Sequence, residues 1–79
     1  MTERAIPQVG MYELTNPDPL RRHTVRSIAT AAGCSWATVH RLRSGKITAV
    51  SEPIAARIAQ ACGMGLADMF RATGRVAWN

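Results

Sequence analysis

Acidic residues are absent from a long central window of this chain. No Asp or Glu occurs between Arg21 and Lys46, whereas six Lys and Arg side chains lie in the same window. All the acidic residues of the chain lie outside it, at Glu3, Glu13, Asp18, Glu52 and Asp68. Because a surface of one sign attracts a polyanion, this gap makes nucleic-acid binding the first hypothesis for function.

Cysteine and histidine are also scarce, which argues against disulfide and metal sites. The two cysteines, Cys34 and Cys62, lie in apolar stretches, where a free thiol packs as a small hydrophobic side chain. We therefore expect no disulfide between them. Together with His23 and His40 they form no close pair at the spacing of metal ligands, so neither a metal nor another cofactor is predicted.

Three further absences narrow the class of protein. No apolar run approaches the ~18 residues that a membrane span needs, so no membrane partner is expected. No secretory signal is recognisable, which favours the reducing cytoplasm as the location. The chain has no paired carboxylates in a cleft-forming context and no nucleophile motif, so we expect neither an enzyme nor a small-molecule ligand.

The chain that remains is short and basic. It has 79 residues, a formal net charge of +5 and an isoelectric point near 10.7. A chain of this length buries only about 60–65% of the surface that its unfolded form exposes, so one small helical domain is expected. The charge favours an anionic partner without identifying it, because small basic proteins are common and charge also keeps them soluble.

Residues 1–15 are predicted to be an N-terminal arm. Three apolar residues are spaced as in a short extended segment: Val9, Met11 and Leu14. The run 16–19, Asn-Pro-Asp-Pro, is typical of a helix start with Asn16 as the cap, and it predicts a first helix over 17–22. The alternative for this stretch is an irregular arm.

The central window is predicted to hold two helices. Thr24 is a suitable N-cap, and apolar or small residues follow it at helical spacing: Val25, Ile28, Ala29 and Ala32. That helix must end at Gly33, because glycine tolerates the left-handed geometry of a tight exit. Ser35 caps a second helix, over 35–44, whose inner face carries Val39 and Leu42.

The remainder is predicted to be mostly helical. Residues 46–50 form a connector, Ser51 caps a fourth helix, and a last short helix over 66–70 closes the core. The tail, 71–79, ends in an extended segment. We therefore predict an all-α fold with five helices in a domain over 16–70, and with short extended segments at both termini.

Three motifs occur in a characteristic order and spacing. They are I-A-T-A-A-G-C-S at 28–35, R-L-R-S-G-K at 41–46 and I-A-Q-A-C-G-M-G-L-A-D-M-F at 58–70. In these motifs the chain resembles the Cro/XRE, or lambda-repressor-like, helix-turn-helix family. The resemblance implies a compact five-helix domain that reads the major groove of double-stranded DNA with helix 35–44, as a homodimer on a two-fold operator.

Position within that family and charge together give the expected contacts. Base contacts are expected from Trp36, Ala37, His40 and Arg41. Phosphate contacts are expected from Arg22, Thr24, Arg26, Ser35, Thr38, Arg43 and Lys46. Arg41 either presents a bidentate fork to guanine or touches only phosphate and solvent. Ala37 meets a thymine methyl or is a plain helix former, and His40 donates to DNA or is a plain surface residue. Trp36 either packs on sugars and thymine methyls or folds back onto Leu20 or the arm.

One position departs from the family pattern. Gln usually follows the capping residue, and here Val25 stands there, so that phosphate contact is lost or moved. The predicted function is a sequence-specific DNA-binding transcriptional regulator, a repressor, of a bacterial cell or a phage-infected host. The alternative is a protein-interaction adaptor that uses the same fold through terminal apolar residues: Tyr12, Val76 and Trp78.

Overall fold

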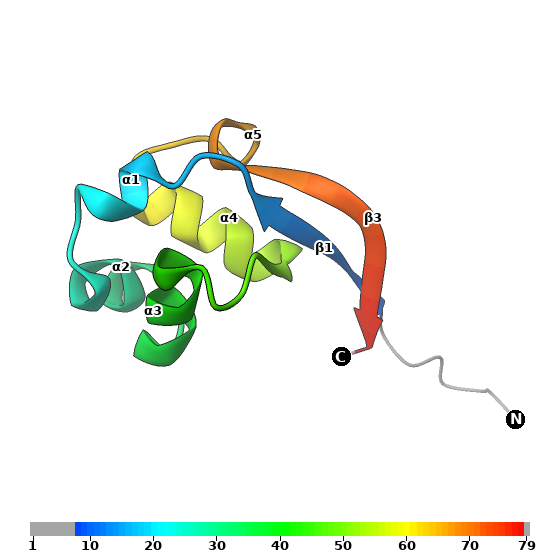
Figure 1. Ribbon diagram of the computed structural model, residues 1–79, viewed down its shortest axis with the longest axis horizontal. Coiled ribbons are helices and arrows are strands. Elements are labelled where there is room, and N and C mark those ends of the chain that lie inside the picture. Colours follow the sequence, from blue (N-terminus) through cyan, green and yellow to red (C-terminus); the bar gives the residue numbers. More distant parts are fainter. Residues whose placement is uncertain (1–7, 79) are drawn as a thin grey trace, which may run out of the picture.

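Five helices and three strands make up the part of the chain that the computed structural model describes, residues 8–78. In chain order the elements are β1 (Gln8–Leu14), α1 (Asp18–Arg21), α2 (Val25–Ala32), α3 (Trp36–Ser44), β2 (Ala49–Ser51), α4 (Glu52–Ala61), α5 (Leu66–Met69) and β3 (Phe70–Trp78). The helices form a body from which β1 and β3 project as a ribbon (Figure 1). Residues 1–7 of the predicted arm and Asn79 of the predicted tail lie outside the described residues.

The two helices predicted in the central window are confirmed. At the start of α2, Thr24 Oγ1 accepts a hydrogen bond of 3.0 Å from the Ser27 N–H. At the start of α3, Ser35 Oγ accepts one of 3.1 Å from the Thr38 N–H. Gly33 follows α2 with a φ of 66°, in the left-handed region that favours glycine. The helix boundaries are therefore set by capping residues that are recognisable in the sequence.

The other helices differ from the predictions in detail. Helix α1 is shorter by one residue at each end, and Pro17, not Asn16, occupies its N-cap position. Asn16 Oδ1 still accepts a hydrogen bond of 3.3 Å from the Asp18 N–H. Ser51 precedes α4 as predicted, but its side chain makes no capping hydrogen bond. Helix α5 stops one residue earlier than predicted, because Phe70 begins β3.

The all-α prediction is wrong, because the two ends of the chain pair in a three-stranded antiparallel sheet of order β2-β1-β3. Extended segments are present at both ends, as expected, but they pair with one another, so that Leu14 opposes Phe70 and Gln8 opposes Trp78. Strand β2 lies at the end of the predicted connector and pairs with β1. Pairing gives the backbone N–H and C=O groups of these segments their hydrogen-bond partners.

The hydrophobic core lies between the helices and one face of the sheet. Its buried side chains are Leu20, Ile28, Ala29, Ala32, Val39, Leu42, Val50, Ala55, Ile58, Ala59, Met69 and Phe70. Val39 and Leu42, which helical spacing places inward, are 0% and 2% exposed. No polar or charged side chain of the described residues is buried. The polar and charged side chains of these residues therefore all lie at least partly exposed to solvent.

Both cysteines are free and half-buried. Partial burial raises the pKa of the Cys34 thiol and of the Cys62 thiol, because desolvation disfavours the thiolate. Between residues 8 and 78, no group of three or more His, Cys, Asp or Glu side chains is placed to hold a metal ion. None of the helices in that range has the length and apolar character needed to cross a membrane.

Candidate nucleic-acid interface

Helices α2 and α3 form one packed unit around the turn at Gly33. Ile28 of α2 and Val39 of α3 are buried in the same core cluster. Within the turn, the Cys34 N–H donates a hydrogen bond of 3.1 Å to the Ala29 carbonyl oxygen. Buried packing on one side and an internally bonded turn on the other fix the direction of α3. Its outward side chains are therefore presented on a rigid support.

The outer face of α3 is the surface that this packing leaves uncovered. Trp36, His40 and Arg41 are exposed, and Ala37 is half-buried. Residues three and four apart on a helix lie on the same face, which places these side chains together. The structure thus groups the four residues for which the sequence predicts base contacts. No residue of α3 is acidic.

Trp36 stacks on His40 at the surface. The two ring centroids lie 5.1 Å apart and the ring planes differ by 4°. Trp36 is 57% exposed, so it does not fold back into the core beside Leu20. The stack holds the indole parallel to the imidazole of the residue one turn further along the helix. Sequence reasoning missed this contact, because the four-residue spacing places the two side chains on one face without specifying that their rings stack.

Basic side chains that have no acidic partner among residues 8–78 accompany this face. Four exposed ones lie before, on or after α2 and α3: Arg22, Arg26, Arg43 and Lys46. The ion pairs formed by residues 8–78 are Arg21 with Asp18, at 3.7 Å, and Arg71 with Glu13. Neither pair involves those four cations, so their charge is available to an anion. The exposed Arg21–Asp18 pair contributes only about 0–1 kcal/mol and does not hold Arg21 firmly.

The hydroxyl groups predicted to contact phosphate also cap the helices. Thr24 Oγ1 accepts the Ser27 N–H, which leaves the hydroxyl proton of Thr24 for a further acceptor. Ser35 Oγ lies 2.8 Å from Thr38 Oγ1, so one of these two hydroxyls donates to the other. The pair therefore keeps a single hydroxyl proton for an outside acceptor. Capping and phosphate binding are compatible at both sites.

Comparison with known proteins gives one match. The family model of the Cro/C1-type HTH DNA-binding domain matches residues 20–73 of the sequence, which include α2, the turn and α3. The match extends from Leu20 in α1 to Thr73 in β3, about two thirds of the chain. Neither the curated proteins nor the solved structures gave a match.

Proposed function

The chain belongs to the Cro/C1-type family of helix-turn-helix DNA-binding domains, and we propose that it is a sequence-specific transcriptional regulator that binds double-stranded DNA. The outer face of α3 carries this proposal, because it is exposed, free of acidic residues and supported by buried ones. A protein that occupies a DNA site blocks access of others to it, so we propose that this regulator is a repressor.

In the proposed complex α3 enters the major groove, whose width admits one helix. Arg41 extends from the exposed face and can donate two parallel hydrogen bonds to O6 and N7 of guanine. His40 lies beside it as a further donor. Ala37 and the flat Trp36 ring offer apolar contact to thymine methyl groups. The recognised sequence therefore combines a guanine with neighbouring thymines.

Phosphate contacts surround the base contacts in this proposal. The proposed cationic contacts are Arg22, Arg26, Arg43 and Lys46, and the proposed hydroxyl contacts are Thr24, Ser35 and Thr38. Each phosphate neutralised by a cation releases condensed counterions, so that affinity falls as salt rises. With about four such contacts per protomer, the slope of log affinity against log salt is about −3.6.

We further propose that two copies bind a two-fold symmetric site in the cytoplasm of a bacterial cell or a phage-infected host. One α3 reads only a few base pairs, and a second copy about one helical turn, ~34 Å, away doubles the sequence that is read. Net positive charge and the absence of acidic residues from the α2–α3 window support DNA as the partner.

Selection from a random duplex library tests this function. The purified chain is mixed with the library at about 0.15 M salt, and bound fragments are sequenced over successive rounds. We expect a consensus with inverted half-sites that contain guanine and thymine. A bound pool without sequence enrichment would contradict specific recognition, and a consensus without symmetry would contradict the two-fold arrangement.

A second candidate function is a protein-interaction adaptor. Val76 favours it, because this apolar side chain is 57% exposed on the ribbon. The side chain of Trp78 lies outside those described, and Tyr12 is half-buried beside Glu52, whose carboxylate raises the pKa of the Tyr12 phenol. DNA binding that is insensitive to salt and to Arg41→Ala, together with loss of a protein partner on Val76→Asp, would favour the adaptor.

A further inference from the structure

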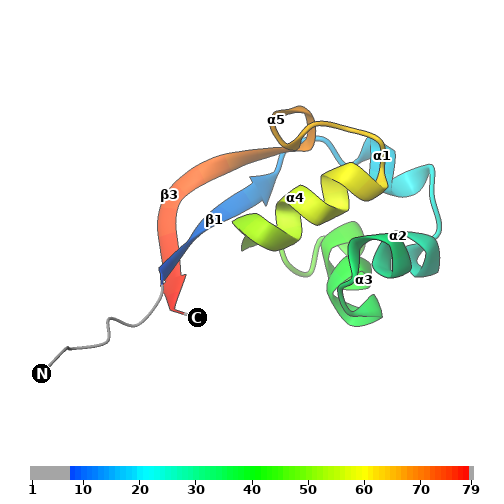
Figure 2. The same cartoon turned by 180° about the vertical axis from the view of Figure 1, so that it is seen from behind.

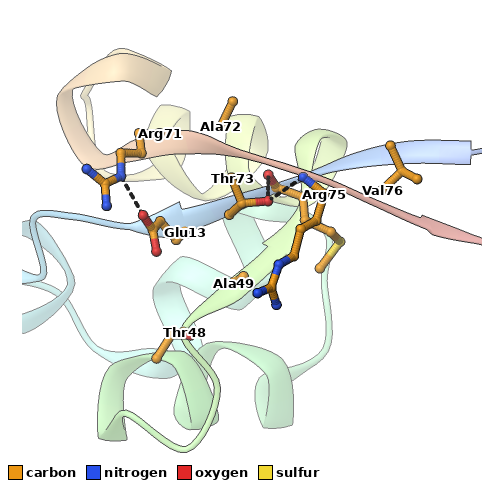
Figure 3. Close-up of a pocket in the computed structure, with 9 residues that line it drawn as sticks. Glu13, Thr48, Ala49, Arg71, Ala72, Thr73, Arg75 and Val76 are labelled. Carbon is orange, nitrogen blue, oxygen red and sulfur yellow. Dashed lines mark hydrogen bonds and ion pairs between the residues drawn. The ribbon is translucent and has the colours of Figure 1, made fainter.

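The face of the sheet that points away from α4 carries polar side chains in a surface hollow. Tyr12 packs against the buried core, so its neighbours Met11 and Glu13 point to the opposite face of β1. Met11, Glu13, Thr48, Ala49, Arg71, Thr73 and Arg75 are among the residues that line the hollow (Figure 3). We call this surface the outer sheet face.

A bulge in β3 shapes this surface. Gly10 opposes Val76 and Tyr12 opposes Ala72, so three residues of β3 stand opposite Met11 alone. Thr73 Oγ1 donates a hydrogen bond of 3.0 Å to the Met11 carbonyl oxygen and accepts one of 3.0 Å from the Arg75 N–H. Between them, Gly74 has a φ of 81°. Such a bulge bends a strand and re-aims its side chains.

The far end of β3 bends in the direction in which helix α3 lies. In both overall views β3 curves toward the side on which α3 lies (Figures 1 and 2). In the close-up, the Arg75 guanidinium extends from β3 over the sheet toward Ala49 of β2 (Figure 3). Arg75 of the outer sheet face thus extends toward β2, the strand that follows α3 in the chain.

The outer sheet face continues into the proposed DNA interface. Thr48 lines the hollow that contains Arg75, and it also lines a neighbouring hollow together with Arg43, Ser44 and Gly45 at the end of α3. Thr48 thus joins the C-terminal end of α3 to the sheet. The two adjoining hollows thus form a continuous surface between Arg43 and Arg75.

The charge of this surface suits a phosphate. Arg71 forms an ion pair with the carboxylate of Glu13. Arg75 is exposed and, among residues 8–78, has no carboxylate within ion-pair distance. Two arginines and one glutamate leave the face with one net positive charge. That charge lies on Arg75, at one end of the surface that extends from Arg43.

We propose that the outer sheet face binds the phosphodiester backbone of the duplex that α3 reads, beyond the bases that α3 contacts, with Arg75 as the phosphate ligand. This inference rests on the proposed DNA-binding function. The ribbon then acts as a clamp that adds affinity without sequence preference, because phosphates are the same at every base pair. Pairing of the β3 edge with a second copy is disfavoured, because charged side chains such as Arg71 and Arg75 protect an edge.

The test compares two duplexes that carry the same selected site, one ending at the site and one extended by about ten base pairs on each side. Affinities are measured from about 50 to 200 mM salt for the wild type, Arg75→Ala and Arg75→Lys. Arg57→Ala, which removes an exposed arginine from α4, is the matched control. We expect Arg75→Ala to bind the extended duplex with a slope shallower by about 0.9, and several-fold more weakly at the lowest salt.

Arg75→Lys should restore the slope, Arg57→Ala should behave as the wild type, and all variants should bind the short duplex alike. Equal binding of wild type and Arg75→Ala to the extended duplex would overturn the inference while leaving α3 as the reader. A change of oligomeric state of Arg75→Ala in sedimentation would also overturn it, in favour of a contact between copies. A wild type that binds neither duplex would overturn the proposed function, and this inference with it.

Discussion

The α2–α3 unit and the β1–β3 ribbon are built in opposite ways. The unit is a contiguous stretch of chain with both N-caps bonded, and five of its side chains are buried: Ile28, Ala29, Ala32, Val39 and Leu42. The ribbon joins the two ends of the chain, and Phe70, at its base, is its buried side chain among those described. Rigid support therefore lies under the proposed base-reading face, whereas the ribbon tolerates change.

Truncating a side chain in each region should give the largest difference between the α2–α3 unit and the ribbon, in the free energy of unfolding. Leu42→Ala removes a fully packed side chain of α3 and should lower the free energy of unfolding by about 2–5 kcal/mol. Val76→Ala, on the exposed part of the ribbon, should change it by less than about 0.5 kcal/mol. Urea unfolding followed by circular dichroism measures both. Equal losses would contradict the difference in support between the unit and the ribbon.

Loss of the guanidinium of Arg41 should come next in size, and it should affect binding alone. Arg41→Ala is expected to cost about 1–3 kcal/mol of affinity for the selected site and to relax specificity at one base pair. Arg43→Ala should weaken binding to all sequences alike and make the salt slope shallower by about 0.9. Titrations on the selected duplex and its point variants distinguish these outcomes. An equal loss of affinity for all these duplexes on Arg41→Ala would indicate that Arg41 contacts phosphate and not a base.

Two of the glycines with positive φ, Gly33 in the turn and Gly74 in the bulge, allow a matched comparison. An added Cβ has no heavy atom within 4 Å at Gly33 or at Gly74, so Gly→Ala costs only the backbone strain, about 1–2 kcal/mol at each. Gly33→Ala should also weaken binding to the short duplex, because the turn directs α3. Gly74→Ala should spare it. Gly10→Ala, at a glycine without positive φ, is the control.

The smallest expected effect concerns the caps. Ser35→Ala removes the acceptor of the Thr38 N–H and should cost about 1 kcal/mol of stability. Ser51→Ala should cost less, because the Ser51 side chain makes no capping hydrogen bond. Thermal unfolding of the two variants under identical conditions decides the order. A greater loss for Ser51→Ala would contradict the assigned caps.

Helices α2 and α3 could be predicted from sequence because their signals are local. Thr24 and Ser35 supply capping hydroxyls, and Gly33 supplies the left-handed exit, all within a few residues of the boundaries that they set. The proposed base contacts lie on one face for the same reason, since helical periodicity alone groups Ala37 with His40 and Arg41.

The sheet could not be predicted in this way. Strand β2 has only three residues, and β1 also pairs with β3 near the opposite end of the chain, where no local pattern indicates the register. The bulge at Gly74 exists only because β1 lies opposite it. The direction of Trp36 was also open, because helical spacing gives the face of the helix but not the stacking of the ring on His40.

The most direct test of the central claim is the affinity of the purified chain for its selected duplex and for a scrambled duplex of equal length, measured across salt concentration. If α3 reads base edges while the cations hold phosphates, the selected duplex should bind at least ~10³-fold more tightly at physiological salt, and both affinities should fall steeply as salt rises. Equal affinity for the two duplexes, or affinity independent of salt, would contradict the account.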